Sequence, residues 1–308
     1  MHSALAILLP LLAIGFTLSC SSERPKAPSN MAAAGEAKAE RKELRDGIKK
    51  IEPFFKPMAA PAGYDWLATH NEAGETFAEY LDAGPSKPTR ERQKIYVLPL
   101  GEFREKQQNL IKITVGYLEA FYDLPVELMP TRDLQFASPN FRQNRHTRNR
   151  QVKTTYILDE ILGPMLPADA AALIALTTSD LYSNESTNFV FGQASLDRRV
   201  GIWSLARLDD NADGHTFLLR TLKIAAHETG HMFSMRHCTK WECVMSGTNH
   251  LAETDRRPID ACPECTAKIC WLSDVDGAQR YERLAKFCLS KGLKAEAADF
   301  ARKVDAVR

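Results

Sequence analysis

Two histidines and a glutamate lie close together in the second half of the chain, in the order His227, Glu228 and His231. On a helix, residues four apart share one face, so both imidazoles would lie one turn apart on the same side. Two neutral imidazoles in this arrangement can hold one Zn²⁺ at about 2.0–2.1 Å and leave its other coordination positions open. In the HExxH pattern the glutamate is the general base that takes a proton from zinc-bound water. The spacing therefore predicts a catalytic zinc site.

A third histidine, His237, follows six residues after His231. This separation is too long for both side chains to share one helical face. We therefore expect the chain to leave the helix soon after His231. It must then turn back before His237 can complete a three-histidine site.

Four cysteines follow the histidines at short intervals, the last two as a Cys-x-x-Cys pair: Cys238, Cys243, Cys262 and Cys265. Four thiolates are the ligands of a closed structural zinc site. In an exported chain the six cysteines after Cys20 could instead form disulfides, because an oxidising compartment favours them. The spacing beside a metal-binding helix favours zinc. Cys270 and Cys288 lie outside the pattern and are either buried thiols or paired with each other.

The run from His227 to Cys265 reads HExxHxxSxxHC-x4-CxM-x16-CxxC. It resembles the signature of the archaemetzincin family of zinc metallopeptidases, HExxHxxGxxHC-x4-CxM-x17-CxxC. The resemblance implies a catalytic zinc on three histidines: His227, His231 and His237. It implies a second, structural zinc, so two per chain, on four cysteines: Cys238, Cys243, Cys262 and Cys265. Glu228 would be the catalytic base, and Met245 the Met-turn methionine, a hydrophobic floor beneath the metal site and not a ligand.

Two positions depart from that signature. Ser234 stands where the family has a glycine, at the turn off the active-site helix. A glycine there serves a positive φ, and a serine would cost roughly 1–2 kcal/mol in the left-handed region. The spacer before Cys262 is one residue shorter, which a loop absorbs. Neither departure removes a ligand.

The N-terminus has the features of an export signal. Residues from Leu5 to Leu18 are almost all apolar, and this run is too short to span a bilayer comfortably. The cysteine that follows it, Cys20, resembles the lipidated cysteine of a bacterial lipoprotein. The alternative is an ordinary cleaved signal peptide with a chance cysteine. We expect a lipoprotein signal over residues 1–20 and an exported protein that is anchored to the membrane of a bacterial cell envelope.

Composition divides the rest of the chain. The 308 residues allow one large domain or two small ones, and the content of 44% hydrophobic and 26% charged residues is ordinary for a globular protein. We expect a flexible tether at 21–37, an N-terminal helical extension at 38–93 and a metallopeptidase domain at 94–308. Within the extension we predict a solvated helix near 38–50 and another helix within 64–81.

Apolar runs of strand length alternate with amphipathic stretches of helix length from Lys94 onward. The strand–helix–strand order implies crossovers and neighbouring parallel strands. We therefore expect an α/β fold with a mixed, mostly parallel sheet, and the resemblance implies a metzincin-like form of it with a zinc-stapled C-terminal part. The predicted strands are 95–100, 125–129, 171–178, 188–194 and 200–208. The predicted helices are 106–122, 152–165, 217–233, 279–291 and 294–307.

Smaller features admit two interpretations each. The stretch 209–214 resembles a fragment of a calcium loop but lacks the later glutamate, so we interpret it as a turn before a helix capped by Thr216. The strand at 188–194 either borders the cleft, where a peptide can add as a further strand, or is covered. We expect a polar loop from Met245 to Pro258, in which His250 is exposed or stabilises an oxyanion.

The basic stretch from Arg132 to Lys153 is the only segment that suggests nucleic-acid binding. The formal net charge of +1 gives that function no electrostatic support, and few aromatic residues interleave with the arginines. We predict a solvated loop there, prone to proteolysis, and no nucleic-acid partner.

Peptide-bond hydrolysis is the function that these observations favour, with a peptide or protein substrate and a monomeric enzyme. The alternative is a non-catalytic, zinc-stabilised surface lipoprotein that binds peptide without cutting it. The intact Glu228 argues against this alternative, and Ser234 is the one feature in its favour.

Overall fold

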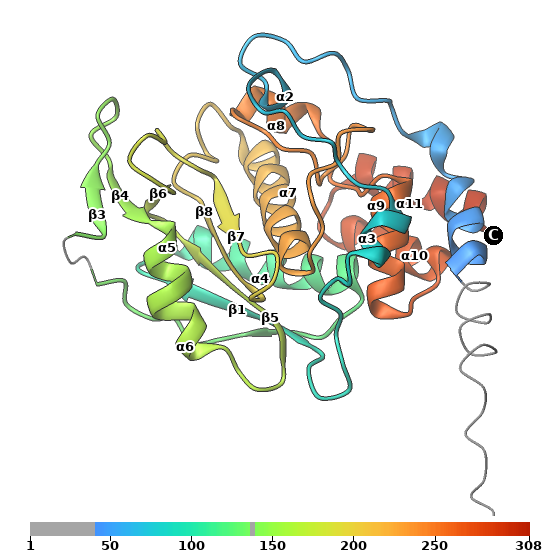
Figure 1. Ribbon diagram of the computed structural model, residues 1–308, viewed down its shortest axis with the longest axis horizontal. Helices are drawn as coiled ribbons and strands as arrows, with labels where there is room; N and C mark the ends of the chain where they lie inside the picture. Colours follow the sequence, from blue (N-terminus) through green and yellow to red (C-terminus); the bar gives the residue numbers. More distant parts are fainter. Residues whose placement is uncertain (1–40, 136–138) are drawn as a thin grey trace, which may run out of the picture. The chain divides into compact units, whose positions relative to one another are not determined.

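The computed structural model describes residues 41–135 and 139–308 (Figure 1). The expected signal peptide, Cys20 and the expected tether lie outside the described residues. Residues Glu40–Arg308 form one compact unit. The N-terminal extension therefore folds together with the peptidase segment.

A five-stranded sheet in the order β2-β1-β5-β8-β7 forms the centre of this unit. Four strands run parallel: β1 (Lys94–Leu100), β2 (Val126–Leu128), β5 (Ala170–Thr177) and β8 (Val200–Ser204). The edge strand β7 (Gly192–Ala194) pairs with β8 in the antiparallel direction. The expected mixed, mostly parallel sheet is confirmed, although the predicted strands at 188–194 and 200–208 are longer than β7 and β8.

Helices cover both faces of the sheet, and its central strands β1, β5 and β8 are buried on both sides. Side chains alternate along β1: Ile95 and Val97 belong to one core, and Tyr96 and Leu98 to the other. The first core includes residues of α4 (Glu105–Tyr122) and α7 (Gly214–Met232). The second includes a helical run made of α5 (Thr154–Tyr156), the π-helical η2 (Ile157–Leu162) and α6 (Gly163–Met165). Because both faces are buried, the strands are continuous apolar runs.

We predicted a solvated loop for the basic stretch from Arg132 to Lys153, and this prediction is wrong for its second half. The stretch contains β3 (Phe141–Gln143) and β4 (Arg150–Lys153), which form a small sheet with β6 (Asp180–Tyr182). The Arg142 guanidinium donates hydrogen bonds to main-chain carbonyls between Asn184 and Asn188 and lies 3.9 Å from the centre of the Tyr182 ring. This arginine is therefore committed to holding a loop of its own chain.

Helix α7 begins three residues earlier than predicted. Its N-cap is Asp213, whose carboxylate accepts a hydrogen bond from the Thr216 main-chain N–H at 2.7 Å. The predicted cap Thr216 is thus the partner of the cap, and residues 209–213 form the turn that precedes the helix.

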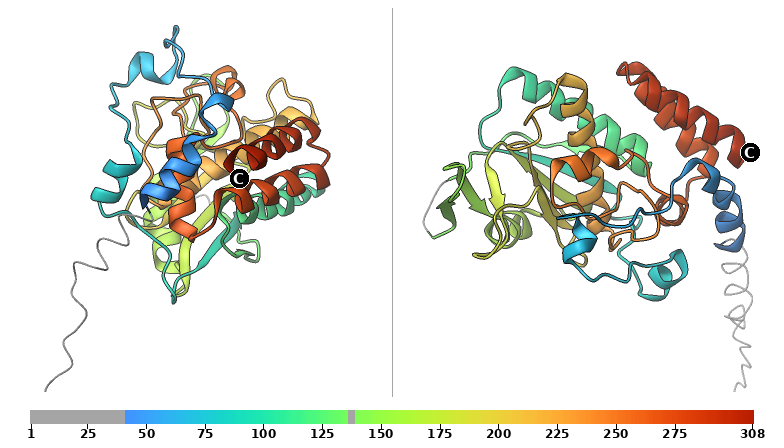
Figure 2. Two further views of the ribbon diagram at one scale, coloured as in Figure 1. Left: turned by 90° about the vertical axis from the view of Figure 1, so that its right-hand side faces the viewer. Right: turned by 90° about the horizontal axis from the view of Figure 1, so that it is seen from above.

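The N-terminal extension packs more closely than its charge pattern indicates. The helix over residues 41–49 is not simply solvated, because Ile48 and Ile51 are fully buried. After η1 (Glu52–Phe54), the predicted helix within 64–81 is replaced by two short ones, α2 (Trp66–Thr69) and α3 (Phe77–Asp82). A capping box between Thr76 and Glu79 begins α3, and residues 70–76 before it belong to no helix or strand. The extension begins beside the two C-terminal helices, runs to α2 near the short helix Leu251–Arg256, and then reaches α3 (Figures 1 and 2).

Four helices complete the C-terminal part: α8 (Leu251–Arg256), α9 (Pro263–Ser273), α10 (Gly277–Ser290) and α11 (Lys294–Val307). The last two confirm the sequence prediction. The first lies where we predicted a polar loop, and it forms because the His250 ring nitrogen accepts a hydrogen bond from the Glu253 N–H at 3.2 Å and caps the helix.

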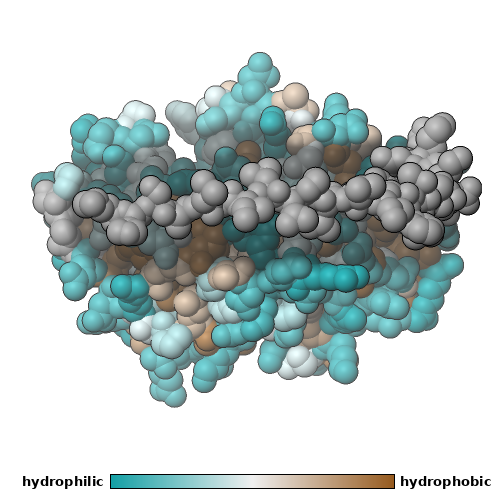
Figure 3. Space-filling model, turned by 60° about the horizontal axis from the view of Figure 1, so that its bottom comes forward, coloured by the Kyte–Doolittle hydropathy of each residue, from teal (hydrophilic) through white to brown (hydrophobic). Residues whose placement is uncertain are grey.

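Hydrophilic residues make up most of the face in Figure 3, with hydrophobic residues set back between them. Within residues 41–135 and 139–308, no helix has both the length and the apolar character needed to cross a membrane.

Candidate metal centres and active site

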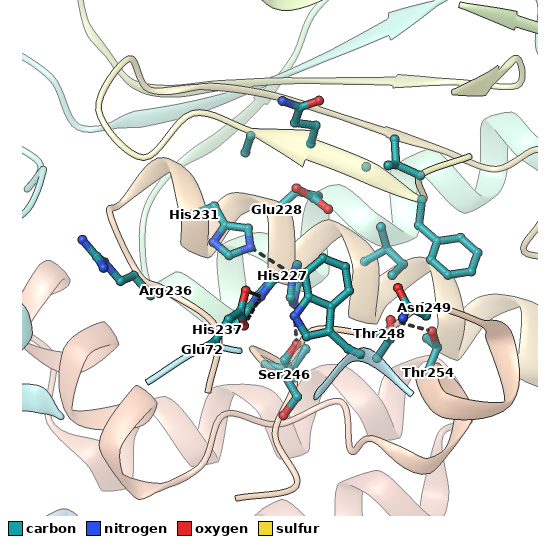
Figure 4. A pocket seen from close by; sticks show the side chains of 18 of the residues that line it. Glu72, His227, Glu228, His231, Arg236, His237, Ser246, Thr248, Asn249 and Thr254 are labelled. Atoms are coloured by element: carbon teal, nitrogen blue, oxygen red, sulfur yellow. Dashed lines mark hydrogen bonds and ion pairs between the residues drawn. The ribbon is translucent and has the colours of Figure 1, made fainter. Parts of the chain in front are cut away.

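His227 and His231 lie one turn apart on α7, and their Nε2 atoms are 3.0 Å apart (Figure 4). The Nδ1 atom of His227 lies 2.9 Å from the Val244 carbonyl, and that of His231 lies 2.7 Å from the Met235 carbonyl. A carbonyl only accepts, so each Nδ1 carries the proton and each Nε2 presents a lone pair. Burial, then the neighbouring histidines, lowers the pKa of both rings, to about 3 for His231. Both rings are therefore neutral, as metal ligands must be.

His237 joins them from the loop after α7. Its Nδ1 lies 2.9 and 3.1 Å from the two carboxylate oxygens of Glu72, so this ring also leaves Nε2 free. The three histidines present one ligand atom each within 4.8 Å of one another. Nitrogens on a tetrahedral zinc at about 2.0–2.1 Å would be about 3.4 Å apart. The arrangement therefore fits a three-histidine zinc site.

The turn between α7 and His237 depends on Ser234. This residue has φ of +65°, the left-handed conformation that the family glycine predicts. Its hydroxyl donates to the Leu196 carbonyl at 2.6 Å and accepts from the Ser86 N–H at 3.0 Å. Each such hydrogen bond contributes about 1 kcal/mol. The two bonds together offset the strain of roughly 1–2 kcal/mol that a serine has in this conformation.

Glu228 lies on α7 beside the edge strand of the sheet. Burial raises the pKa of its carboxyl to about 8. A Cβ atom at Gly192 of β7 would lie only 2.5 Å from a Glu228 carboxylate oxygen. The absence of a side chain at position 192 therefore makes the space that Glu228 occupies.

Met245 is fully buried against α7. Its sulfur would be 2.6 Å from a Cβ atom at Gly230, which lies between the two metal-facing histidines of the helix. The Met245 carbonyl accepts a hydrogen bond from the Cys238 N–H at 2.8 Å. These contacts place the methionine under the histidine-bearing turn, where the resemblance expects a hydrophobic floor.

The four predicted cysteine ligands form one buried cluster: Cys238, Cys243, Cys262 and Cys265. The sulfurs of Cys238 and Cys262 are 3.6 Å apart. Four sulfurs on a tetrahedral zinc at about 2.3 Å would be about 3.8 Å apart, so this donor set also fits the ion. Cys270 and Cys288 are buried free thiols outside the cluster, and burial raises the pKa of each to about 12.

A cleft of about 770 Å³ opens over the three histidines. One side is the segment from Phe189 to Ala194, which contains the edge strand, and another is the loop after Met245 with Ser246 and Thr248. The third side comes from the N-terminal extension, through Trp66 and residues 71–74. His250 is not among the described residues that line the cleft, and its Nε2 lies 3.2 Å from an Asp65 oxygen.

Glu72 and Trp66 are two cleft residues beside His237 that sequence reasoning missed. The Trp66 ring meets the His237 ring edge-on, with centroids 5.0 Å apart. Both residues lie more than 150 positions before the HExxH motif, in a stretch that we assigned to a helix. An acidic residue among many others has no spacing that marks it as a partner of a distant histidine.

The fold and the two clusters define the class: a zinc-dependent metallopeptidase with an HExxH helix and a third histidine after a turn. The model of the family described as "Peptidase family M54" matches residues 160–270. Archaemetzincin-2 of Mus musculus is 32% identical, over 80% of this chain and 79% of that protein. Archaemetzincin of Archaeoglobus fulgidus is 31% identical, over 57% of this chain and 98% of that protein. The chain belongs to the archaemetzincin family and is a zinc metallopeptidase.

A solved structure agrees with this assignment. The crystal structure of archaemetzincin from Methanopyrus kandleri is 26% identical, with a TM-score of 0.51, over 61% of this chain and 99% of that one. The match to the mouse protein extends further along the present chain. Its 80% share is about 246 residues, more than the 215 from Lys94 to Arg308, so the similarity reaches into the N-terminal extension.

Proposed function

We propose that the chain hydrolyses peptide bonds in the cleft above the three histidines. The observation that carries the proposal is the convergence of three Nε2 atoms beside a buried carboxylate, with every Nδ1 held by a hydrogen bond. His227, His231 and His237 would hold the catalytic zinc. A bound zinc supplies a Lewis acid that polarises the scissile carbonyl and lowers the pKa of water toward about 7.

Glu228 is the proposed general base. Its carboxylate takes a proton from the attacking water and delivers it to the leaving amine. A carboxylate in this position can accept a proton and return it within one reaction cycle. Contact with Gly192 keeps the carboxylate next to the strand along which the substrate would lie.

The proposed substrate is a peptide in extended conformation that adds to β7. Phe191 and Ser195 flank β7 and exchange main-chain hydrogen bonds with Ser204 and Val200 on the β8 side. Hydrogen-bonding directions alternate along a strand, so the main-chain groups of Gly192 and Ala194 point to the open edge. A further strand can bind there by main-chain hydrogen bonds, which select for shape more than for side chains.

The non-catalytic alternative loses its one supporting feature. Ser234 adopts the conformation expected of the family glycine and is held by two hydrogen bonds. The cleft is open, and Glu228 is present. No observation in the described part of the chain favours peptide binding without cleavage.

The test is a digest of a peptide library by the metal-loaded protein and by Glu228→Gln. We expect the wild-type chain to cut peptides and the variant to keep its zinc while turnover falls by about two orders of magnitude or more. Unchanged peptidase activity in the variant would remove Glu228 from the mechanism. Two zinc ions in wild type by metal analysis would support the cysteine cluster as the second site.

We also propose that the protein is a lipoprotein anchored to the membrane of a bacterial envelope through Cys20. The apolar run that ends at this cysteine supports the proposal. One acyl chain anchors a protein only marginally, but several anchor it stably. Cys20→Ala should release the protein from the membrane fraction or leave its signal uncleaved. A mature N-terminus other than a lipidated Cys20, measured by mass spectrometry, would refute the proposal.

A further inference from the structure

We propose that Glu72 of the N-terminal extension is a positioning residue that orients His237 and sets the affinity of the three-histidine site for zinc. The inference rests on the proposed role of His237 as a ligand. It gives the extension a part in catalysis that neither its sequence nor the HExxH motif indicates.

The contact between Glu72 and His237 is direct. Both carboxylate oxygens lie within hydrogen-bond distance of Nδ1, at 2.9 and 3.1 Å, and the two residues are 165 positions apart in the chain. The side chains are 17% exposed for His237 and 30% for Glu72, so solvent competes only partly for this bond. In Figure 4 the carboxylate lies next to the His237 ring.

The other two histidines are held differently. Their Nδ1 atoms donate to the carbonyls of Val244 and Met235, which belong to the same segment of chain as the ligands. His237 depends on a charged side chain from outside that segment. A carboxylate fixes the tautomer and orientation of a ligating imidazole and also raises its basicity, so it strengthens the metal bond more than a neutral carbonyl does.

The segment that carries Glu72 is fixed on both sides of this residue. Before it, the main-chain N–H of Trp66 donates to the Glu253 carboxylate at 3.0 Å. After it, the Ala73 carbonyl accepts from the Thr239 hydroxyl at 3.2 Å. Gly74, at φ of +70°, lets the two segments touch, because a Cβ there would be 2.3 Å from the Thr239 oxygen. The extension is therefore bonded to its neighbours on both sides of Glu72, which places this carboxylate beside His237.

The experiment titrates Zn²⁺ into the metal-free chain with a competing chromophoric chelator. The step that belongs to the histidine site is identified as the one that His227→Ala abolishes. We expect Glu72→Gln and Glu72→Ala to lower zinc affinity at this step by about 10–100-fold, the usual effect of losing an outer partner of a metal ligand. The step that belongs to the cysteine cluster should not change. Glu91→Gln is the matched control, since Glu91 is an exposed carboxylate of the same extension that bonds Thr89.

A merely structural role for Glu72 would lower the thermal stability of the metal-free protein and leave zinc affinity at the histidine site alone. Zinc affinity within twofold of wild type for Glu72→Ala would overturn the inference. His237→Ala distinguishes a wrong role for Glu72 from a wrong zinc site. If it lowers zinc affinity while the Glu72 variants do not, only the role of Glu72 is wrong. If the His237→Ala variant also binds zinc with wild-type affinity, His237 is not a ligand and the proposed three-histidine site is wrong.

Discussion

The proposed catalytic carboxylate, Glu228, and the edge strand meet at a single glycine, Gly192. A methyl group at Gly192 would lie 2.5–2.7 Å from the outer atoms of Glu228. Those atoms are the flexible end of a side chain, so the carboxylate can move aside without disturbing the backbone. A substitution at position 192 can therefore change turnover and leave thermal stability unchanged.

We predict that Gly192→Ala lowers turnover by about 10–100-fold, because a displacement of about 1 Å at a reacting group can cost around a hundredfold in rate. Zinc content and thermal stability should stay close to wild type. The control is Gly214→Ala, since a Cβ at Gly214 meets no atom within 4 Å. Peptidase rates and metal content of both variants check the prediction. An unaffected rate in Gly192→Ala would show that Glu228 does not need this space.

Ser234 gives a second prediction at the scale of the residue. Ser234→Ala removes two hydrogen bonds but keeps a side chain in the left-handed region, so the free energy of unfolding should fall by roughly 1–2 kcal/mol. Ser234→Gly loses the same bonds but relieves the strain, so its stability should lie within about 1 kcal/mol of wild type. Denaturant unfolding of the two variants measures the difference. Equal destabilisation by alanine and glycine would contradict a strained turn.

The cysteine cluster shares its loop with the three-histidine site. Cys238 directly follows His237, and Val244, which holds His227, directly follows Cys243. The Cys243 sulfur also accepts from the Cys262 N–H at 3.2 Å. Residues next to Cys238 and Cys243 therefore position two of the three histidines, His237 and His227.

Loss of one sulfur should accordingly affect both metal sites. We predict that Cys262→Ser or Cys265→Ser lowers zinc at the histidine site as well as at the cluster, and lowers the peptidase rate by about a hundredfold. Cys288→Ser is the control, because Cys288 is a buried thiol outside the cluster. Zinc stoichiometry, free thiols and rates are measured together. One zinc per wild-type chain with four oxidised cluster cysteines would replace the cluster by disulfides.

Elements differ in how far the sequence alone could predict them. Strands β1 and β5 were predictable because burial on both faces requires a continuous apolar run. Strands β3 and β6 were not, since three residues are too few to show a period. The two clusters that could hold a metal were predictable, because one helix turn or one loop fixes the order of their residues. Glu72 was not, because only the packed structure brings it to His237.

At the scale of the whole molecule, the two ends of the compact unit pack together. Ile48, in the helix over residues 41–49, is 2% exposed, and its Cδ1 would lie 2.5 Å from a Cβ atom at Gly277 of α10. The Lys50 ammonium donates to the Val307 carbonyl of α11 at 3.3 Å. The helix that directly follows the expected tether is thus part of the core, and its attachment stabilises the extension that carries Glu72.

We predict that Ile48→Ala lowers the free energy of unfolding by about 2–4 kcal/mol, the usual effect of truncating a buried isoleucine. Glu43→Ala, an exposed position of the same helix, should change it by less than about 0.5 kcal/mol. Denaturant unfolding measures both, and limited proteolysis shows whether the extension is released. If Ile48→Ala behaves like Glu43→Ala, the helix is a solvated part of the tether, and the extension must be held by its contacts near the cleft alone. A loss of stability confined to Ile48→Ala would instead show that packing of the helix over residues 41–49 against α10 and α11 stabilises the fold of the extension.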